Sequence, residues 1–335
     1  MGEAERAHRT GFSSVQGLTR EFRKDDYDKV LKMTEMFVWE DMPEKDPKTG
    51  TLTTAGWIPR VQKIMKIIVI YVMTVHSIQS CIRIVNNHEL MFVSWYPFDM
   101  TRSPTFEIVY ITQIFGLILG CSTCFAFPAM YITSICIACS QLEKLECKLL
   151  RIRQKHRASN EEADSIFEAD FEIQKELNEC IRHHQKIIRY LNALETAMNI
   201  PVGGILLVQL ITLCTIAFSV IVNWGDLLDL IQAATLYIVM LLTVFTFCGM
   251  GTVITDKYES VREAAWSSDW VGAPVSYQRC ILFIIAKSNQ EFQLTAWKFV
   301  PLSNTTMMSV LFDKGEWNHG RNVNYHDAVL RTQEQ

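Results

Sequence analysis

The fold is decided between residues 230 and 255, which read LIQAATLYIVMLLTVFTFCGMGTVIT. This run holds no Asp, Glu, Lys or Arg, and it exceeds the roughly 20 residues that a helix needs to cross a hydrocarbon core of about 30 Å. The same is true of residues 108–142 and of residues 196–225. The sequence therefore predicts three membrane-spanning helices in these runs.

A fourth candidate span, Ile64–Val85, is apolar but carries a cation near each end. Lys66 and Arg83 have side chains long enough to extend toward the lipid headgroups, so the segment is also interpreted as a span. A composition of 49% hydrophobic and 20% charged residues would also suit a soluble protein. The charges are unevenly distributed, however, and the long runs without them favour a membrane protein. We expect an all-α fold, a polytopic membrane helical bundle.

The orientation follows from the basic residues, because short loops rich in Lys and Arg stay on the cytoplasmic side. Residues 1–63 hold eleven Lys and Arg, residues 143–195 hold ten and residues 256–298 hold five, whereas residues 86–105 hold one. The pattern predicts a cytoplasmic N-terminus, an outer loop at residues 86–105 and a last apolar run, Phe299–Phe312, that points outward.

Residues 143–195 combine dense mixed charge with apolar residues at helical intervals. The apolar positions are Leu142, Leu145, Leu149 and Ile152, then Ile166, Phe171, Ile173, Leu177, Ile181, Ile188 and Leu191. This spacing predicts two amphipathic cytoplasmic helices with a break near residues 158–160. Eleven acidic residues balance ten basic ones in this segment, so no nucleic-acid partner is indicated.

The segment after the last long apolar run, residues 256–311, carries a long ordered string of residues. It contains, in order, Val261, Ala264–Ala265, Trp266, Asp269–Trp270, Pro274, Arg279, Ile284–Ile285, Ser288, Gln290, Leu294–Thr295–Ala296, Lys298–Phe299 and Pro301–Leu302–Ser303. The string resembles the C-terminal signature of the insect odorant receptors, seven-helix ligand-gated cation channels unrelated to G-protein-coupled receptors. The resemblance implies an odorant-binding (tuning) subunit in the plasma membrane of olfactory neurons, assembled with a co-receptor as a tetramer. It implies no enzymatic activity and no cofactor.

Two further segments resemble the same family. Residues 180–187 with Leu194–Glu195 are similar to its entry into the fifth helix, and Trp95–Asp99 with Tyr110 and Gln113 to its outer loop before the fourth. The four spans then correspond to the family's third to sixth helices. The resemblance divides the chain into a cytoplasmic segment (1–60), two spans (61–142), a cytoplasmic helical extension (143–195), two spans (196–255), a cytoplasmic anchor (256–298), a shortened pore helix (299–312) and a polar tail (313–335).

The sequence departs from the family at both ends. The family's first two helices have no counterpart, and the run Phe299–Phe312 would make a helix of only about 21 Å at 1.5 Å per residue. An alternative therefore stays open, in which the chain is a truncated or misspliced receptor product without channel activity. A metabotropic seven-helix receptor is disfavoured, because no Asp-Arg-Tyr motif follows a third span and no Asn-Pro-x-x-Tyr motif ends a seventh. A transporter is disfavoured, because the three long apolar runs hold no charged residues at mid-membrane.

Candidate site residues follow from the resemblance. A small volatile apolar ligand would contact residues in the outer half of the bundle, which are Met73, His76, Ser80, Tyr110, Gln113, Ile114 and Tyr237. The subunit interface would include Trp266, Asp269, Trp270, Pro274, Arg279, Ser288 and Gln290. The pore would include Thr306 and Val310. Lipid-facing positions and ordinary helix packing remain alternatives for these residues.

No metal site is expected. Cys121/Cys124 and Cys136/Cys139 have CxxC spacing, but they lie inside an apolar run without a second ligand pair. His183 and His184 are adjacent, yet no carboxylate stands at ligand spacing. These cysteines are interpreted as packing residues and these histidines as residues of a helix interface or surface.

Overall fold

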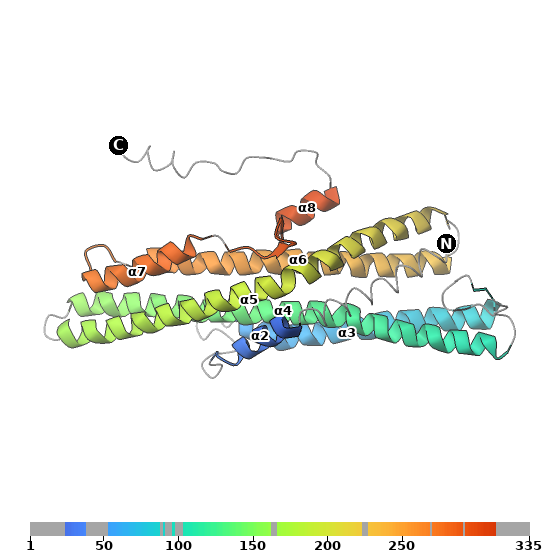
Figure 1. The fold of residues 1–335 in the computed structure, drawn as a ribbon, viewed down its shortest axis with the longest axis horizontal. Coiled ribbons are helices and arrows are strands. Elements are labelled where there is room, and N and C mark those ends of the chain that lie inside the picture. Colours follow the sequence, from blue (N-terminus) through green and yellow to red (C-terminus); the bar gives the residue numbers. More distant parts are fainter. Residues whose placement is uncertain are drawn as a thin grey trace.

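The fold is an elongated bundle of long helices (Figure 1). A computed structural model describes residues 24–37, 53–87, 90, 96–97, 103–161, 166–222, 227–268, 270–290 and 292–312. The helices are α2 (Lys24–Thr34), α3 (Thr54–Asn87), α4 (Thr105–Glu161), α5 (Ile166–Val222), α6 (Leu227–Trp266), α7 (Val275–Ser288) and α8 (Asn304–Phe312). Two short strands, β1 (Thr295–Ala296) and β2 (Val300–Pro301), form an antiparallel hairpin between α7 and α8.

The membrane and the extramembrane helices are continuous with each other. The charge-free run at residues 108–142 forms the first part of α4, which continues through the charged segment to Glu161. Helix α5 begins at Ile166 in the charged segment and runs into the charge-free residues 196–222. The break predicted near residues 158–160 thus falls at the end of α4. Helix α5 bends part way along (Figure 1). Pro201 lies inside this helix and has no amide hydrogen for the helical hydrogen bond, which is a common cause of such a bend.

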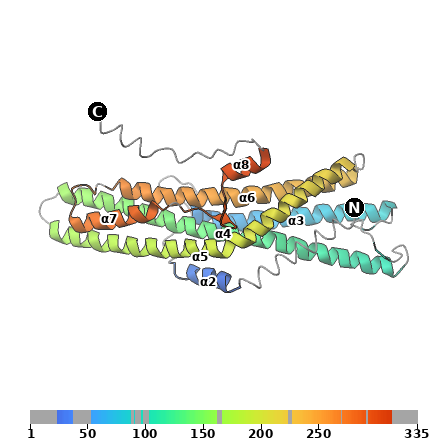
Figure 2. The same ribbon diagram turned by 45° about the horizontal axis from the view of Figure 1, so that its top comes forward.

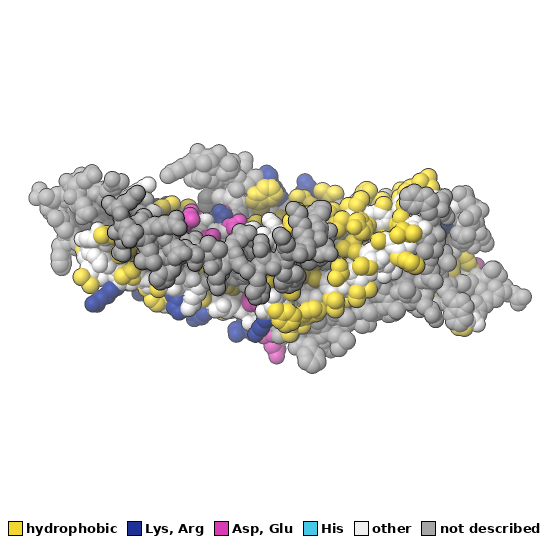
Figure 3. Space-filling view, turned by 90° about the horizontal axis from the view of Figure 1, so that it is seen from above, with side chains coloured by type: hydrophobic (Ala, Val, Ile, Leu, Met, Phe, Trp, Pro, Cys, Tyr) yellow, Lys and Arg dark blue, Asp and Glu magenta, His cyan; other side chains and the backbone are white. Residues whose placement is uncertain are grey.

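Four helices of the described chain are long and apolar enough to cross a membrane, namely α3, α4, α5 and α6. Their large side chains are exposed along one half of the bundle, for example Ile70 on α3, Phe115 on α4 and Ile221 on α5. Figure 3 shows hydrophobic side chains gathered over one end of the molecule and basic side chains toward the other. An apolar outer surface over half of a bundle suits lipid contact, because lipid tails take the place of a protein core.

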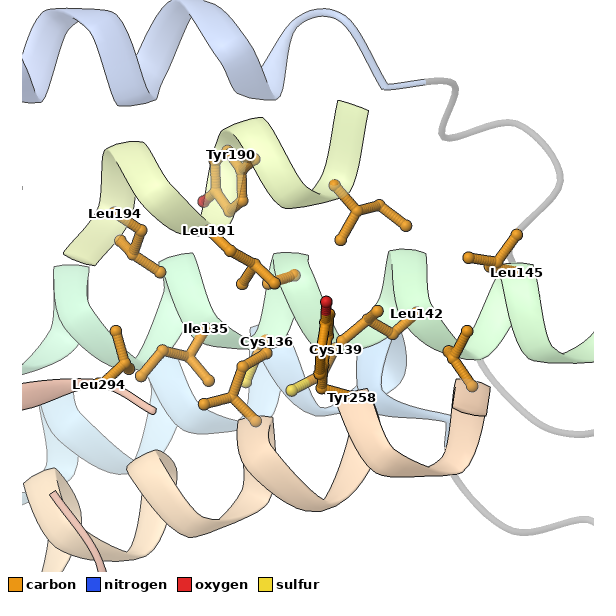
Figure 4. Close-up of a cluster of buried hydrophobic side chains, with 14 of the residues drawn as sticks. Ile135, Cys136, Cys139, Leu142, Leu145, Tyr190, Leu191, Leu194, Tyr258 and Leu294 are labelled. Carbon is orange, nitrogen blue, oxygen red and sulfur yellow. The ribbon is translucent and has the colours of Figure 1, made fainter. Parts of the chain in front are cut away.

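The tightest core lies in the other half, where α4, α5 and α6 run side by side (Figure 4). It is built from the predicted stripe: Leu142, Leu145, Leu149, Ile152, Ile173, Leu177 and Leu191 are all buried, as predicted. Phe171 belongs to the same predicted stripe, but its side chain is 70% exposed and is not covered by the described part of this chain. Cys136 and Cys139 are buried packing residues of this core.

A three-helix junction marks the boundary between the two halves. Glu143 of α4 forms an ion pair with Lys257 of α6 (2.9 Å) and accepts a hydrogen bond from the Thr54 amide (3.1 Å). It also accepts a hydrogen bond from the Thr54 hydroxyl, so one carboxylate closes the N-terminus of α3. Charge-assisted bonds of this kind are stronger than neutral ones, and this one ties α3, α4 and α6 together at one level.

The last apolar run differs from the expected helix. Phe299–Phe312 was predicted as a single helical segment, but the helix begins only at Asn304. Residues 300–301 form strand β2 instead, and Pro301 has no amide hydrogen to donate within a helix. Helix α8 therefore starts after a hairpin and lies beside α6 (Figures 1 and 2).

Candidate functional site

A buried polar stripe runs along the C-terminal part of α3. His76, Gln79, Ser80 and Arg83 are each at most 6% exposed, and their spacing places them on one face of the helix. The Ser80 hydroxyl lies 3.0 Å from the Tyr110 hydroxyl of α4, so the structure brings two of the predicted ligand contacts together. The opposite face of α3 is apolar and exposed, as at Ile78. The stripe therefore turns polar groups inward, against α4.

The α4 side of this site is aromatic and amide-bearing. Phe106 stacks on Tyr110 with a ring separation of 6.4 Å, and Gln113 donates to the Tyr96 hydroxyl at 3.3 Å. The predicted contacts Met73 and Ile114 are half-buried on α3 and α4. Tyr237 on α6 is 39% exposed. Sequence reasoning missed Gln79 and Arg83, although the helical spacing from His76 was a usable signal.

The predicted interface residues divide between the surface and the core. Trp266 is 64% exposed and packs edge-on against the half-buried Trp270, with ring centroids 5.8 Å apart. Pro274, Arg279 and Gln290 are exposed. Asp269 lies outside the described residues. Ser288 is buried inside the chain, where its hydroxyl lies 3.5 Å from His184, so it faces the core of its own subunit.

Other exposed apolar side chains follow Trp266 on the loop to α7 and on α7, which packs beside α6. Val271 is 81% exposed, and Val275 and Leu282 on α7 are also exposed. We call Trp266, Val271, Val275 and Leu282 the anchor patch. It belongs to the charged half of the molecule, where lipid does not account for exposed apolar surface, so it has the composition of a contact surface. Sequence reasoning found the tryptophans of this region but not the aliphatic positions.

His183 and His184 lie on the charged part of α5, outside the apolar runs. Burial lowers the pKa of each ring to about 4, so both are neutral at pH 7. The His184 ring lies 6.2 Å from the ring of Tyr258, consistent with a helix-interface role. Among the described residues, no group of three or more His, Cys, Asp or Glu side chains is placed to hold a metal ion.

The hairpin before α8 is fixed to α5 by three successive helical turns. Glu195 accepts a hydrogen bond from the Thr295 amide (3.1 Å) and another from its hydroxyl. The Asn199 carbonyl accepts from the Trp297 amide (3.1 Å). One turn further, a Cβ atom at Gly203 would lie 2.8 Å from the Trp297 ring, so only glycine leaves room for that ring.

Helix α6 holds the hairpin from the other side. The Thr255 hydroxyl donates to the Phe292 carbonyl (3.2 Å), and the Thr252 hydroxyl accepts from the Asn304 amide (3.0 Å). A Cβ atom at Gly251 would lie 2.1 Å from the Leu302 carbonyl oxygen. We call Glu195, Asn199, Gly203, Gly251, Thr252 and Thr255 the hairpin clamp.

The hairpin turn is itself strained. Trp297 and Lys298 have φ angles of 54° and 65°, in the left-handed region that residues with side chains seldom adopt. Each such residue costs on the order of 1–3 kcal/mol and persists only where its surroundings fix it. The hairpin clamp supplies those surroundings.

The first turn of α8 contains one predicted pore residue. The Ser303 hydroxyl accepts from the Thr306 amide (3.2 Å) and lies 3.0 Å from the Thr306 hydroxyl, so Ser303 caps the helix. The backbone of Val310 belongs to α8, but its side chain lies outside the described residues. The hairpin clamp therefore determines where the segment with the predicted pore residues begins.

Membrane-length helices, a packed extramembrane half and a clamped terminal helix define a multi-pass membrane protein. A family model described as 7tm Odorant receptor matches residues 52–311. The chain belongs to the odorant receptor family, and the resemblance inferred from its sequence is confirmed.

Similar proteins agree with this assignment. Odorant receptor 2a of Drosophila melanogaster is 24% identical over 69% of this chain, and odorant receptor 10 of Aedes albopictus is 24% identical over 64%. The chain spans 59% and 54% of the lengths of these relatives. The structure of the insect olfactory receptor OR5 from Machilis hrabei in complex with eugenol superposes with a TM-score of 0.73 at 14% identity. The superposition covers 90% of this chain and 76% of that receptor, so the all-α fold prediction is confirmed.

Proposed function

We propose that this chain is the ligand-binding subunit of an odorant-gated, non-selective cation channel in the plasma membrane of olfactory neurons, assembled with the family's co-receptor. The observation that carries the proposal is the match of the odorant receptor family model over residues 52–311. The structural neighbour was determined with eugenol, a small aromatic molecule, which supports a small volatile ligand. The experiment that tests the proposal is the recording of odorant-evoked current from cells that express this chain with the co-receptor, against co-receptor alone.

The ligand is proposed to bind at the polar stripe of α3 and the facing part of α4. The hydrogen bond between Ser80 and Tyr110 and the neighbouring Gln113 place polar groups among half-buried apolar side chains such as Met73 and Ile114. Ligand sites for small apolar molecules have this composition, with apolar walls and a few polar groups that fix orientation.

The anchor patch is proposed as the contact surface for neighbouring subunits. Replacing Trp266 by alanine is expected to weaken association with the co-receptor, because a desolvated tryptophan at an interface contributes about 2 kcal/mol or more. Trp270→Ala is also expected to weaken association with the co-receptor. Co-immunoprecipitation with the co-receptor measures the effect.

Trp57→Ala is the matched control for this experiment. Trp57 is also an exposed tryptophan, at 45%, but it lies on α3 away from the anchor patch. Equal recovery of the co-receptor with all three variants would refute the interface proposal and leave packing within the subunit as the role of the two tryptophans.

The cytoplasmic N-terminus is likewise proposed, from the distribution of Lys and Arg. In a background without the exposed cysteines Cys81, Cys147 and Cys214, a cysteine at the exposed Ser103 is expected to react with an impermeant maleimide on intact cells. A cysteine at the exposed Gln154 is expected to react only after permeabilisation. The reverse labelling pattern would overturn the orientation.

A further inference from the structure

Gln79, in the buried polar stripe of α3, has a side-chain amide without a hydrogen-bond partner among the described residues. Its side chain is 6% exposed, and within the described part of the chain neither its Oε1 nor its Nε2 atom makes a hydrogen bond. A glutamine amide offers both a donor and an acceptor, so both kinds of bond are unmade at one site. Buried polar groups without partners are rare in native proteins, and each calls for an explanation.

Water from a bulk phase does not readily solve the problem at this position. Gln79 belongs to a helix of membrane-spanning length whose outward face carries Ile78, Ile82 and Val85 in exposed positions. In a bilayer those residues contact lipid, and a buried amide has to be satisfied from within the protein. A leucine or methionine of similar volume would fill the same space without this penalty.

The neighbouring polar groups do not supply the missing bonds. The Ser80 hydroxyl is directed to Tyr110, and the Gln113 amide to Tyr96. The Gln79 amide, one residue before Ser80 on the buried side of α3, adds a donor and an acceptor there. The unpaired Gln79 amide is therefore complementary to a ligand group that both donates and accepts a hydrogen bond.

We propose that Gln79 is the specificity-determining residue of the ligand site and that it selects ligands with a hydroxyl group, which are volatile alcohols. This inference rests on the proposed function, since it concerns the ligand of the same site. A single hydroxyl oxygen accepts a hydrogen bond from Nε2 and donates one to Oε1. A carbonyl compound only accepts, so it leaves Oε1 unpaired, and a hydrocarbon leaves both atoms unpaired. Sites built to bond a hydroxyl discriminate strongly against analogues that lack it.

The test compares hexanol, hexanal and hexane, which share one carbon skeleton and differ in hydrogen-bonding capacity. Binding is measured as the ligand-dependent rise in melting temperature of the purified full chain in lipid nanodiscs, because this readout does not require channel opening. We expect hexanol to bind at least about tenfold more tightly than hexanal, and hexane to bind most weakly. With Gln79→Met, the affinity for hexanol is expected to fall by about tenfold or more while that for hexane is unchanged or higher.

Gln209→Met is the matched control. Gln209 is a buried glutamine of α5, and its Oε1 atom also has no partner among the described residues. The control is expected to keep the order of the three ligands. An unchanged ratio of hexanol to hexane affinity in Gln79→Met, or a wild-type preference for hexanal over hexanol, would overturn the inference. Alcohol-selective binding without any odorant-evoked current beside the co-receptor would support the inference and count against the proposed channel function.

Discussion

Substitution of Gly251 by alanine is expected to dislodge the hairpin before α8 from α6. The added Cβ atom would lie 2.1 Å from the carbonyl oxygen of Leu302 and 2.9 Å from its Cβ. The closest atom belongs to the backbone, so no change of rotamer relieves the overlap. Overpacking of a tight contact costs about 1–3 kcal/mol, and we expect the loss here at the upper end because the segment is also held by Thr252 and Thr255.

The measurement is the thermal unfolding of the purified chain, together with odorant-evoked current beside the co-receptor. Gly249→Ala is the matched control, two residues away on α6, where a Cβ atom would meet only the Asn304 side chain at 3.8 Å. Gly251→Ala is expected to lower the unfolding temperature and to abolish the current, whereas Gly249→Ala is expected to change neither by much. Equal behaviour of the two variants would contradict the close approach of α6 and the hairpin.

Glu195→Ala is expected to release the other side of the same hairpin. The substitution removes the acceptor of two hydrogen bonds, from the Thr295 amide and from its hydroxyl, and it leaves a half-buried amide without a partner. Hydrogen bonds to a charged group contribute about 1.5–3 kcal/mol each, so a loss of about 3 kcal/mol in the free energy of unfolding is expected. The strained turn at Trp297 and Lys298 would lose one of the contacts that hold it.

A double-mutant cycle separates this bond from general damage. Glu195→Gln keeps an oxygen that can accept from the Thr295 amide, so its loss is expected to be smaller than that of Glu195→Ala. Thr295→Val removes the hydroxyl at nearly constant volume. If Glu195 and Thr295 act on each other, the losses of Glu195→Gln and Thr295→Val are non-additive. Additive losses would show that Glu195 acts without the Thr295 hydroxyl.

The helical architecture could be predicted because its signals are local. Three charge-free runs and one apolar run with a cation near each end predicted four spans, which lie in α3 to α6, and the apolar stripe of residues 142–152 formed the buried core. Phe171 lies near the start of α5, and among the described residues no helix of this chain covers it. Helical spacing indicates which residues share a face, but not which neighbour covers that face.

The hairpin before α8 could not be predicted from its own residues. Its strands have two residues each, and its turn contains a tryptophan and a lysine in conformations that favour glycine. Contacts from α5 and α6, far away in the sequence, determine its shape. The same limit applies to Ser288, which the signature placed at an interface and the fold buries against His184, and to Gln79, whose unpaired amide becomes visible only when its neighbours are in place.

An odorant is proposed to open a channel that contains this chain. The most direct measurement is current from excised outside-out patches of cells that express the chain with the co-receptor. A panel of volatile alcohols, aldehydes and esters is applied to the outer face, with no nucleotide at the cytoplasmic face and with co-receptor alone as control. We expect a ligand-specific cation current that survives excision and is missing from the control. A current that requires cytoplasmic nucleotide, or no ligand-specific current although both subunits reach the surface as a complex, would contradict the proposal.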